Sequence, residues 1–361
     1  MGLFLLRRVG VMLLTALCLT FIVYFMTTLY PNLEKLAKTQ GNFRMSDEAV
    51  ASYLDREGYL EPVFKGYGQW LGVLPGHTFT DEDGTVTGRC IAPGTDPADA
   101  PTYCGVLQGD WGQSVTFKDD AGEIIWKRLG LTGWLALAAF AVMIPAALII
   151  GILAGMREGS RMDRSLSTFA IASSATPEYV SGVIFIAIFA ASASPLNAFL
   201  ADMGWISGRT LLKGSATSAM EDITWANFTL PVATIALYGV GYIARMTRAS
   251  MAEVMTAQYI RTARLKGVSF GKVVMKHALR NALIAPFTVI MLQFPYLLTG
   301  VVITETLFNY KGFGWLLVQA ASTNDIQLLL GCSVVAVFVV LVTQLISDIG
   351  YVFLNPRIRI S

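Results

Sequence analysis

Charged residues are scarce in this chain of 361 residues, because Asp, Glu, Lys and Arg together make up only 14% of it. Ordinary soluble domains carry about 25%. The 4 cysteines are too few for a disulfide-rich scaffold, and the 33 glycines exclude a collagen-like chain. Lys and Arg (27) barely outnumber Asp and Glu (25), which argues against a nucleic-acid-binding protein that relies on a global basic field.

The few charges leave long uncharged stretches between them. Five of these stretches are Val9–Leu33, Leu129–Met156, Ile223–Ala244, Asn281–Thr304 and Ile326–Ser347. A sixth apolar stretch, Leu166–Phe189, is interrupted only by Glu178. About 20 apolar helical residues cross a bilayer core. The sequence therefore predicts an all-α integral membrane protein with six transmembrane helices. The first apolar stretch is longer than the core of a signal peptide, so we expect it to be retained.

Basic residues indicate the orientation of the chain. They concentrate in two short segments that follow the apolar stretches Leu129–Met156 and Ile223–Ala244. The first contains Arg157, Arg161 and Arg164, and the second is residues 245–281. Basic residues in short loops near span ends stay on the cytoplasmic side. We therefore expect both termini to be cytoplasmic and residues 31–127 to form a large periplasmic loop or subdomain.

The predicted periplasmic loop has features of a folded element. Ser46 precedes two acidic residues and is a plausible helix start. Cys90 and Cys104 both fall in this loop, where an oxidising compartment favours a disulfide over the alternative of two free thiols. The loop either helps to seat a periplasmic binding protein or is solvated decoration.

The segment 245–281 combines cations with helix formers. We expect a helix over Ala249–Lys266, which ends at Gly267 in a left-handed conformation, and a second helix that Ser269 can cap. Such a basic helix–turn–helix can be a lipid-facing anchor at the membrane surface or a docking element for a cytoplasmic partner.

Residues 261–267 read Arg-Thr-Ala-Arg-Leu-Lys-Gly, and residues 277–281 read His-Ala-Leu-Arg-Asn. This text resembles the "E-A-A-three residues-G" loop of permeases in binding-protein-dependent ABC importers, in the form found in dipeptide, oligopeptide and nickel systems. Arg261 and Thr262 stand where the general pattern has Glu and Ala. Matching text around residues 109–114, 304–314 and 355–358 extends the resemblance over about residues 1–30 and 105–358, but not over 31–104.

The resemblance implies that this loop couples the permease to an ATPase. The residues it assigns to that role are Tyr259, Arg261, Thr262, Ala263, Arg264, Lys266, Gly267, Val268, Ser269, His277, Arg280 and Asn281. It also implies a set of partners: a second, homologous permease, two ATP-binding subunits that use ATP and Mg, and a periplasmic solute-binding protein. A bacterial inner membrane and peptides or related small solutes as cargo follow from the same resemblance.

Polar residues inside the apolar stretches are candidates for lining the pathway. Glu178 follows Pro177, and a charge at membrane depth usually faces a cavity or a partner, although a locally hydrogen-bonded carboxyl is the alternative. The other candidates are Gln293, Tyr296, Thr299 and Glu305.

Catalytic motifs are missing from the sequence. Residues 267–273 resemble a phosphate-binding loop but have three residues between the glycines where four are needed, and Val273 replaces the required Ser or Thr. The only histidines, His77 and His277, are expected in opposite compartments, which excludes a His-based metal site. We therefore predict a non-enzymatic chain that binds no cofactor, metal or nucleic acid itself.

These predictions divide the chain into four parts. Residues 1–30 form the first transmembrane helix, 31–127 the periplasmic subdomain, 128–355 a five-helix core with the coupling loop 245–281, and 356–361 a cytoplasmic tail. A secondary, ion-coupled transporter is the alternative function. The absence of inverted-repeat symmetry argues against it.

Overall fold

The computed structural model describes residues 2–40, 44–81, 83–91, 94–206, 208 and 210–354, without the side chains of 2–5, 297–300 and 351–354. The predicted tail 356–361 therefore lies outside the described residues. The chain divides into two compact units, each discontinuous in sequence. We call residues 2–129 with 316–338 the N-terminal unit, and residues 130–315 with 339 onward the central unit.

Apolar helices dominate the structure, as the hydropathy pattern predicts. Five are long and apolar enough to cross a membrane, at Leu6–Thr27, Ala121–Gly155, Glu178–Asp202, Trp225–Met255 and Ile326–Gly350. Residues Phe270–Ala282 and Ile284–Tyr296 add a sixth candidate if the pair, which is bent by 52°, is counted as one span. Length and composition thus support five or six spans among the described residues.

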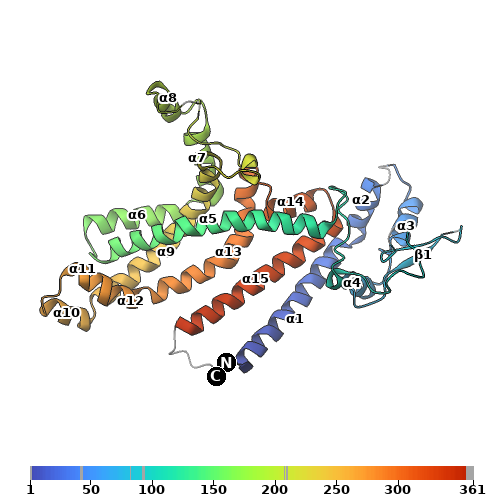
Figure 1. Cartoon of the computed structure of the whole chain (residues 1–361), viewed down its shortest axis with the longest axis horizontal. Coiled ribbons are helices and arrows are strands. Elements are labelled where there is room, and N and C mark those ends of the chain that lie inside the picture. The colour runs from blue at the N-terminus through green and yellow to red at the C-terminus, as the bar shows by residue number, and fades with distance from the viewer. Residues whose placement is uncertain are drawn as a thin grey trace. The chain divides into compact units, whose positions relative to one another are not determined.

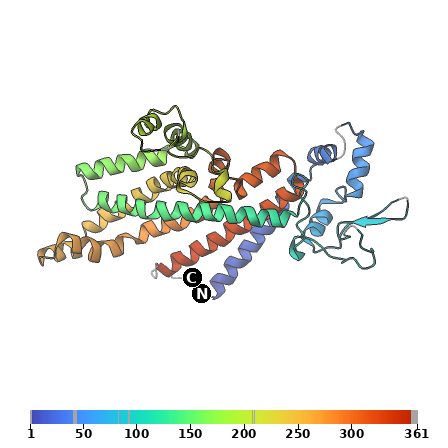
Figure 2. The same cartoon turned by 45° about the horizontal axis from the view of Figure 1, so that its top comes forward.

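The N-terminal unit combines the long helix α1 with several short helices and a small hairpin (Figures 1 and 2). Its elements are α1 (Gly2–Thr27), α2 (Tyr30–Gln40), α3 (Asp47–Arg56), α4 (Val63–Leu71), β1 (Thr78–Thr80), β2 (Val86–Gly88) and the 3₁₀ turn η1 (Val106–Gln108). Strands β1 and β2 pair antiparallel, with Phe79 opposite Thr87. The start of α5 (Ala121–Gly155), the end of α14 (Phe313–Ser322) and the start of α15 (Ile326–Leu354) complete the unit.

One apolar cluster holds the N-terminal unit together. Leu33, Leu54 and Trp70 from α2, α3 and α4 pack with Ile326 and Leu330 from the start of α15. Ser46 caps α3 as predicted, because its hydroxyl accepts a hydrogen bond from the Ala49 N–H at 3.3 Å. The segment between the first two apolar stretches is therefore a folded element and not a loose connection.

The central unit is built around α9 (Trp225–Met255), which packs against α6 (Arg161–Ala175), α7 (Glu178–Phe185) and α13 (Ile284–Leu307). Figure 1 shows α6 and α13 running alongside α9. The remaining elements are the π-helical turn η2 (Ile186–Ala190), α8 (Pro195–Asp202), η3 (Thr217–Met220), α10 (Gln258–Leu265), α11 (Phe270–Lys272), the π-helical turn η4 (Val273–Ala278) and α12 (Leu279–Ala282). Its core includes Met143, Leu230, Ile243 and Val289.

The apolar stretch Leu166–Phe189 is divided between two helices. Helix α6 ends at Ala175, Thr176 is extended (φ −81°, ψ 123°), and α7 begins at Glu178. Pro177 explains the break, because proline lacks an N–H donor and disfavours helical geometry at the preceding residue. Glu178 consequently starts a helix instead of lying ten residues inside one.

The expected helix over Ala249–Lys266 is also interrupted. Helix α9 continues to Met255, and α10 begins at Gln258 after an extended Ala257 (φ −64°, ψ 147°). The Thr256 hydroxyl donates to the Glu253 carbonyl at 2.7 Å, a local bond that competes with helix continuation. The chain therefore changes direction at residues 256–257, and no sequence signal predicts this break.

Candidate functional site: the coupling segment and its support

The coupling segment, residues 256–283, folds as a short helix, a turn and a second helix at the C-terminal end of α9 (Figure 1). Gly267 ends α10 in the left-handed conformation predicted for it (φ +77°). The Val268 N–H then bonds to the Ala263 carbonyl at 3.2 Å, which closes the helix end. Ser269 occupies the N-cap of α11 as expected, but its side chain makes no cap hydrogen bond.

An apolar base fixes the segment to the rest of the central unit. Ile260 and Ala263 of α10 are buried with Val273, Val274 and Ala278 of η4. They pack against Met251, which is fully buried near the end of α9. Burial of an aliphatic side chain contributes about 1.5–3 kcal/mol, so this base holds α10 as a rigid part of the unit. Ala263 therefore serves the base and does not face a partner.

One hydrogen bond joins the two helices of the segment, and a second joins the segment to α9. The Asn281 amide donates to the Tyr259 hydroxyl at 2.8 Å, and the Ser250 hydroxyl donates to the Ala282 carbonyl at 2.8 Å. The Arg157 and Arg264 guanidinium groups lie 5.4 and 5.8 Å from the centre of the Phe270 ring, within cation–π range. Asn281 and Tyr259 are exposed, and the hydrogen bond between them also holds the two helices of the segment together.

The opposite face of the segment is exposed and cationic. Leu265 is 80% exposed at the end of α10, next to the turn. The exposed residues among those predicted to couple to an ATPase are Tyr259, Arg261, Thr262, Arg264, Lys266, Gly267, Ser269, His277, Arg280 and Asn281, whereas Val268 is half-buried. Residues 258–282 contain no Asp or Glu. A rigid basic face with a protruding leucine suits a docking surface.

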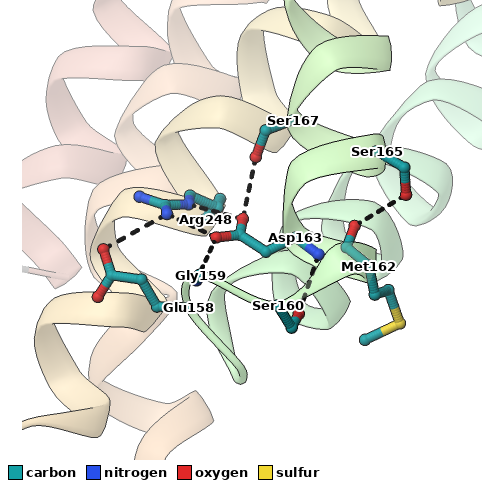
Figure 3. A network of polar contacts seen from close by, with 8 residues as sticks. All are labelled: Glu158, Gly159, Ser160, Met162, Asp163, Ser165, Ser167 and Arg248. Carbon is teal, nitrogen blue, oxygen red and sulfur yellow. Dashed lines mark hydrogen bonds and ion pairs between the residues drawn. The ribbon is translucent and has the colours of Figure 1, made fainter.

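An ion pair with a buried carboxylate joins α6 to α9 near the end of α9 that carries the segment (Figure 3). The Arg248 guanidinium of α9 donates to Asp163 of α6 through Nε (3.0 Å) and Nη2 (2.8 Å). Asp163 also accepts from the Gly159 N–H at 2.8 Å and from the Ser167 hydroxyl at 3.0 Å. Glu158 lies 3.4 Å from Nη2 of the same arginine.

The bidentate bond from Arg248 holds the pKa of Asp163 well below its usual range. Only 3% of Asp163 is exposed, so the carboxylate is charged, buried and fully hydrogen-bonded. The pair locks the start of α6 to the last turns of α9, three residues before Met251 of the apolar base. Sequence reasoning missed this pair, and the only signal was the presence of two acidic residues, Glu158 and Asp163, in a short basic loop.

The pathway candidate Glu178 is buried at the start of α7. It accepts hydrogen bonds from the Thr304 hydroxyl and from the Tyr296 hydroxyl, the latter at 3.4 Å. The Tyr296 ring stacks on Tyr238 of α9, with 5.5 Å between ring centres. Glu178 and Tyr296 are therefore brought together at the junction of α7, α9 and α13, where both can influence how these helices move.

The candidate Glu305 is held in a different arrangement. Its carboxylate accepts from the Thr132 hydroxyl at 2.5 Å and from the Trp315 N–H at 2.9 Å, and Thr132 in turn accepts from the Phe313 N–H at 2.7 Å. The carboxylate thereby fastens the turn before α14 onto α5 and α13. This geometry describes a structural anchor, and a role in the pathway stays a prediction.

Two further pathway candidates lie on α13. Gln293 is buried, with 7% of its surface exposed. Thr299 belongs to α13, but its side chain lies outside the described residues.

In the N-terminal unit a disulfide joins Cys90 and Cys104. It lies next to the β1–β2 hairpin and closes a loop of the segment predicted to be periplasmic. Within the described part of the chain, His, Cys, Asp and Glu side chains form no group of three or more that could hold a metal ion.

Comparison with known proteins places this geometry in a family. Residues 147–360 match the model of the family described as "binding-protein-dependent transport system inner membrane component". The di/tripeptide transport system permease protein DppB of Pseudomonas aeruginosa is 30% identical over an alignment of 376 residues. The alignment covers 99% of this chain and 98% of that protein. The glutathione transport system permease protein GsiC of Salmonella choleraesuis is 31% identical over 254 residues, which cover 70% of this chain and 76% of that protein.

A solved structure, that of an amino acid ABC transporter crystallised with histidines, aligns with a TM-score of 0.45 and 14% identity. The alignment covers 63% of this chain and 93% of the solved chain. The matched family region includes the coupling segment and the Arg248 that supports it. The chain is a member of the family of inner membrane components of binding-protein-dependent transport systems.

Proposed function

We propose that this chain is one of two permease subunits of an ATP-driven importer for short peptides. It crosses the bacterial inner membrane six times with both termini in the cytoplasm, and residues 31–127 lie in the periplasm. Helix α13 (Ile284–Leu307), which follows the coupling segment, provides the sixth span that this topology requires. The basic short segments beside the apolar helices support the orientation.

Two separate ATP-binding subunits and a periplasmic solute-binding protein complete the importer, together with a second, homologous permease. ATP and Mg belong to the ATP-binding subunits, and this chain binds no cofactor of its own. Membership in a binding-protein-dependent family favours this assembly over an ion-coupled secondary transporter, which needs no ATPase.

The cargo class follows from the relatives. One serves di- and tripeptides and another serves glutathione, which is itself a tripeptide. The alignment with the di/tripeptide permease runs over nearly the whole chain, including the segment before α5. We infer that the cargo is a short peptide.

The exposed face of α10 carries the proposal. Leu265 is 80% exposed, which leaves its apolar side chain in contact with water. The apolar base nevertheless holds α10, and with it Leu265, in one position. ATP-driven closure of the ATP-binding subunits would push on this face, and the base and the Asp163–Arg248 pair would transmit the movement to α9 and α6 as a rigid body.

Leu265→Asp tests the docking surface. The substitution places a charge where an apolar side chain would be buried by the ATPase, so we expect the ATPase to co-purify at least about tenfold more weakly and uptake to fall with it. Leu107→Asp is the matched control, because Leu107 is similarly exposed (68%) but lies in the predicted periplasmic segment.

The control should retain both co-purification and uptake. Wild-type ATPase binding and uptake in Leu265→Asp would remove α10 from the interface. Uptake driven by an ion gradient in vesicles without any ATPase would instead support the secondary-transporter alternative.

A further inference from the structure

Helix α4 packs beside the C-terminal half of α1 (Figure 1). The Phe64 ring stacks on the Phe21 ring with 5.0 Å between their centres, and the Tyr67 ring meets Phe21 edge-on at 5.3 Å. The hydroxyl groups of Tyr67 and Thr20 share a hydrogen bond of 2.7 Å. These contacts fix the level along α1 at which α4 lies.

This level is inside the apolar part of α1 and not beyond its end. The candidate membrane span of α1 is Leu6–Thr27, so Phe21 lies six residues before the end of the span. A helix rises about 1.5 Å per residue, which puts the contact with Phe64 about 9 Å before that end along α1. Leu17 and Ile22 of α1 lie on either side of this level and are more than half exposed, as expected of apolar side chains that face lipid.

A second set of contacts holds α4 in this position. Trp70 at the other end of α4 is buried in the apolar cluster of the N-terminal unit, and its ring centre lies 5.9 Å from that of Tyr24 in α1. At Gly66 an added Cβ would lie 2.5 Å from the Tyr24 hydroxyl, so glycine permits the close approach of the two helices. The placement of α4 therefore does not depend on Phe64 alone.

Phe64 is open on the side that Phe21 does not cover. Its side chain is 78% exposed within the chain, at a depth where α1 itself faces lipid. The only charged residue of α4 is Lys65, whose Nζ lies 2.7 Å from Glu61 Oε1. A lysine stem can lie along apolar surface while its charge stays at the level of the headgroups. Helices that lie in a membrane interface bury their apolar face roughly 5–10 Å deep, which agrees with the level of Phe64.

We infer that α4 is a membrane-interface helix and that its Phe64 side chain lies among the acyl chains of the periplasmic leaflet. The partner is lipid, because Phe64 is stacked on a helix that is itself in contact with lipid at this level. Tyr67 and Trp70 combine an aromatic ring with a polar group and suit the same boundary. The segment predicted to be periplasmic is thus held to the membrane surface by α4, and this rests on the proposed topology, in which α1 crosses the membrane.

Hydroxyl-radical footprinting of the wild-type chain in lipid nanodiscs tests this placement without any substitution. The matched control is Tyr103, an aromatic residue of the same unit that is also exposed, although less so (51%). The radicals form in water, so we expect Phe64 to be oxidised at least about fivefold more slowly than Tyr103. Oxidation of Phe64 as fast as that of Tyr103 would place Phe64 in water and overturn the inference.

Lipids with a nitroxide on the acyl chain show whether lipid is what covers Phe64. A bimane fluorophore is attached to Phe64→Cys in a Cys18→Ser background, because Cys18 is an exposed free cysteine. The control label is on Asp83→Cys at the tip of the β1–β2 hairpin, which points away from α1 in Figures 1 and 2. We expect the label at position 64 to be quenched at least about threefold more strongly than the control. Protection of Phe64 from oxidation without such quenching would assign its cover to protein and overturn the inference.

Leu13→Cys in the same background separates this inference from the proposed topology. Leu13 is exposed within the candidate span of α1, so a label there should be quenched if α1 crosses the membrane. Quenching at position 13 without quenching at position 64 would overturn the inference and leave the topology intact. Absence of quenching at both positions would overturn the topology and the inference with it.

Discussion

Asp163 and Arg248 illustrate what a single residue pair contributes to this protein. Their bond joins residues that are far apart in the sequence; it is bidentate, its carboxylate is buried, and the Gly159 N–H and the Ser167 hydroxyl support it. Removing one partner costs stability, but less than in a fully buried pair, because 31% of the Arg248 side chain is exposed. The pair therefore stabilises the contact between α6 and α9 on which the coupling segment depends.

Asp163→Asn should lower the thermal midpoint of unfolding in detergent and reduce uptake, because Arg248 loses its charged partner. Glu158→Gln is the matched control: Glu158 contacts the same arginine at 3.4 Å but is more than half exposed. It should change stability by less than about 1 kcal/mol. Equal effects of the two substitutions would show that burial of the pair is unimportant.

The same pair predicts a pH dependence. Because folding lowers the pKa of Asp163, its contribution to stability is complete above the carboxyl pKa of the unfolded chain. The contribution is lost as the pH falls through the lower, folded-state value. The difference in midpoint between the wild type and Asp163→Asn should therefore be constant near neutral pH and shrink below about pH 4.

Sequence reasoning at this scale succeeds where the signal is local. Ser46 caps α3 and Gly267 is left-handed, as predicted, because both conformations depend on neighbouring residues. The Asp163–Arg248 pair could not be predicted in this way, since its partners are on different helices. The hydrogen bonds that Glu305 accepts from Thr132 and the Trp315 N–H are likewise invisible in the sequence, and its role in the pathway stays a prediction.

At the scale of elements, apolar stretches predict the presence of helices more reliably than the positions of the breaks between them. Pro177 ends α6 and starts α7 by a known stereochemical rule, so that break could have been expected. The break after Met255 is different, because neither Thr256 nor Ala257 is a residue that breaks helices. Packing of Ile260 and Ala263 on the apolar base selects the new direction of α10.

Gly267→Asp tests the turn between α10 and α11. A side chain at φ +77° strains the backbone by about 1–2 kcal/mol and would redirect the exposed face of α10. We expect the variant to insert normally and to lose ATP-driven uptake. Insertion can be measured by its amount in washed membranes, and uptake with a labelled dipeptide.

Gly271→Asp is the control, because it adds the same charge four residues later, also in open space but without the left-handed backbone. It should retain more uptake than Gly267→Asp. Equal loss in both variants would assign the effect to charge, and wild-type uptake in Gly267→Asp would exclude the turn from coupling.

At the scale of the whole molecule, the chain forms two units that are each discontinuous in sequence. Hydropathy alone cannot reveal this arrangement, since it treats the last apolar stretch as one more span. In the structure, the start of that stretch supplies Ile326 and Leu330 to the cluster that contains Leu54 and Trp70. Residues predicted to be periplasmic therefore depend on a helix near the other end of the sequence.

Leu330→Ala tests this dependence. The truncation leaves a void beside Trp70 and should destabilise the N-terminal unit by about 2–5 kcal/mol. We expect proteases added from the periplasmic side to cleave residues 31–127 sooner than in the wild type. Phe338→Ala, at an exposed position of the same helix, should leave the cleavage rate unchanged. Faster cleavage in both variants would indicate a general loss of stability in α15.

The shared cluster also has a consequence for biosynthesis. The nascent chain emerges from the ribosome with α1 to α4 first, long before Ile326 and Leu330 have been made. Until the last helix has been made, Leu54 and Trp70 lack two of the side chains that cover them. In the predicted topology the segment spends that interval in the periplasm with apolar surface exposed to aggregation and proteolysis, which makes it a natural client of periplasmic chaperones.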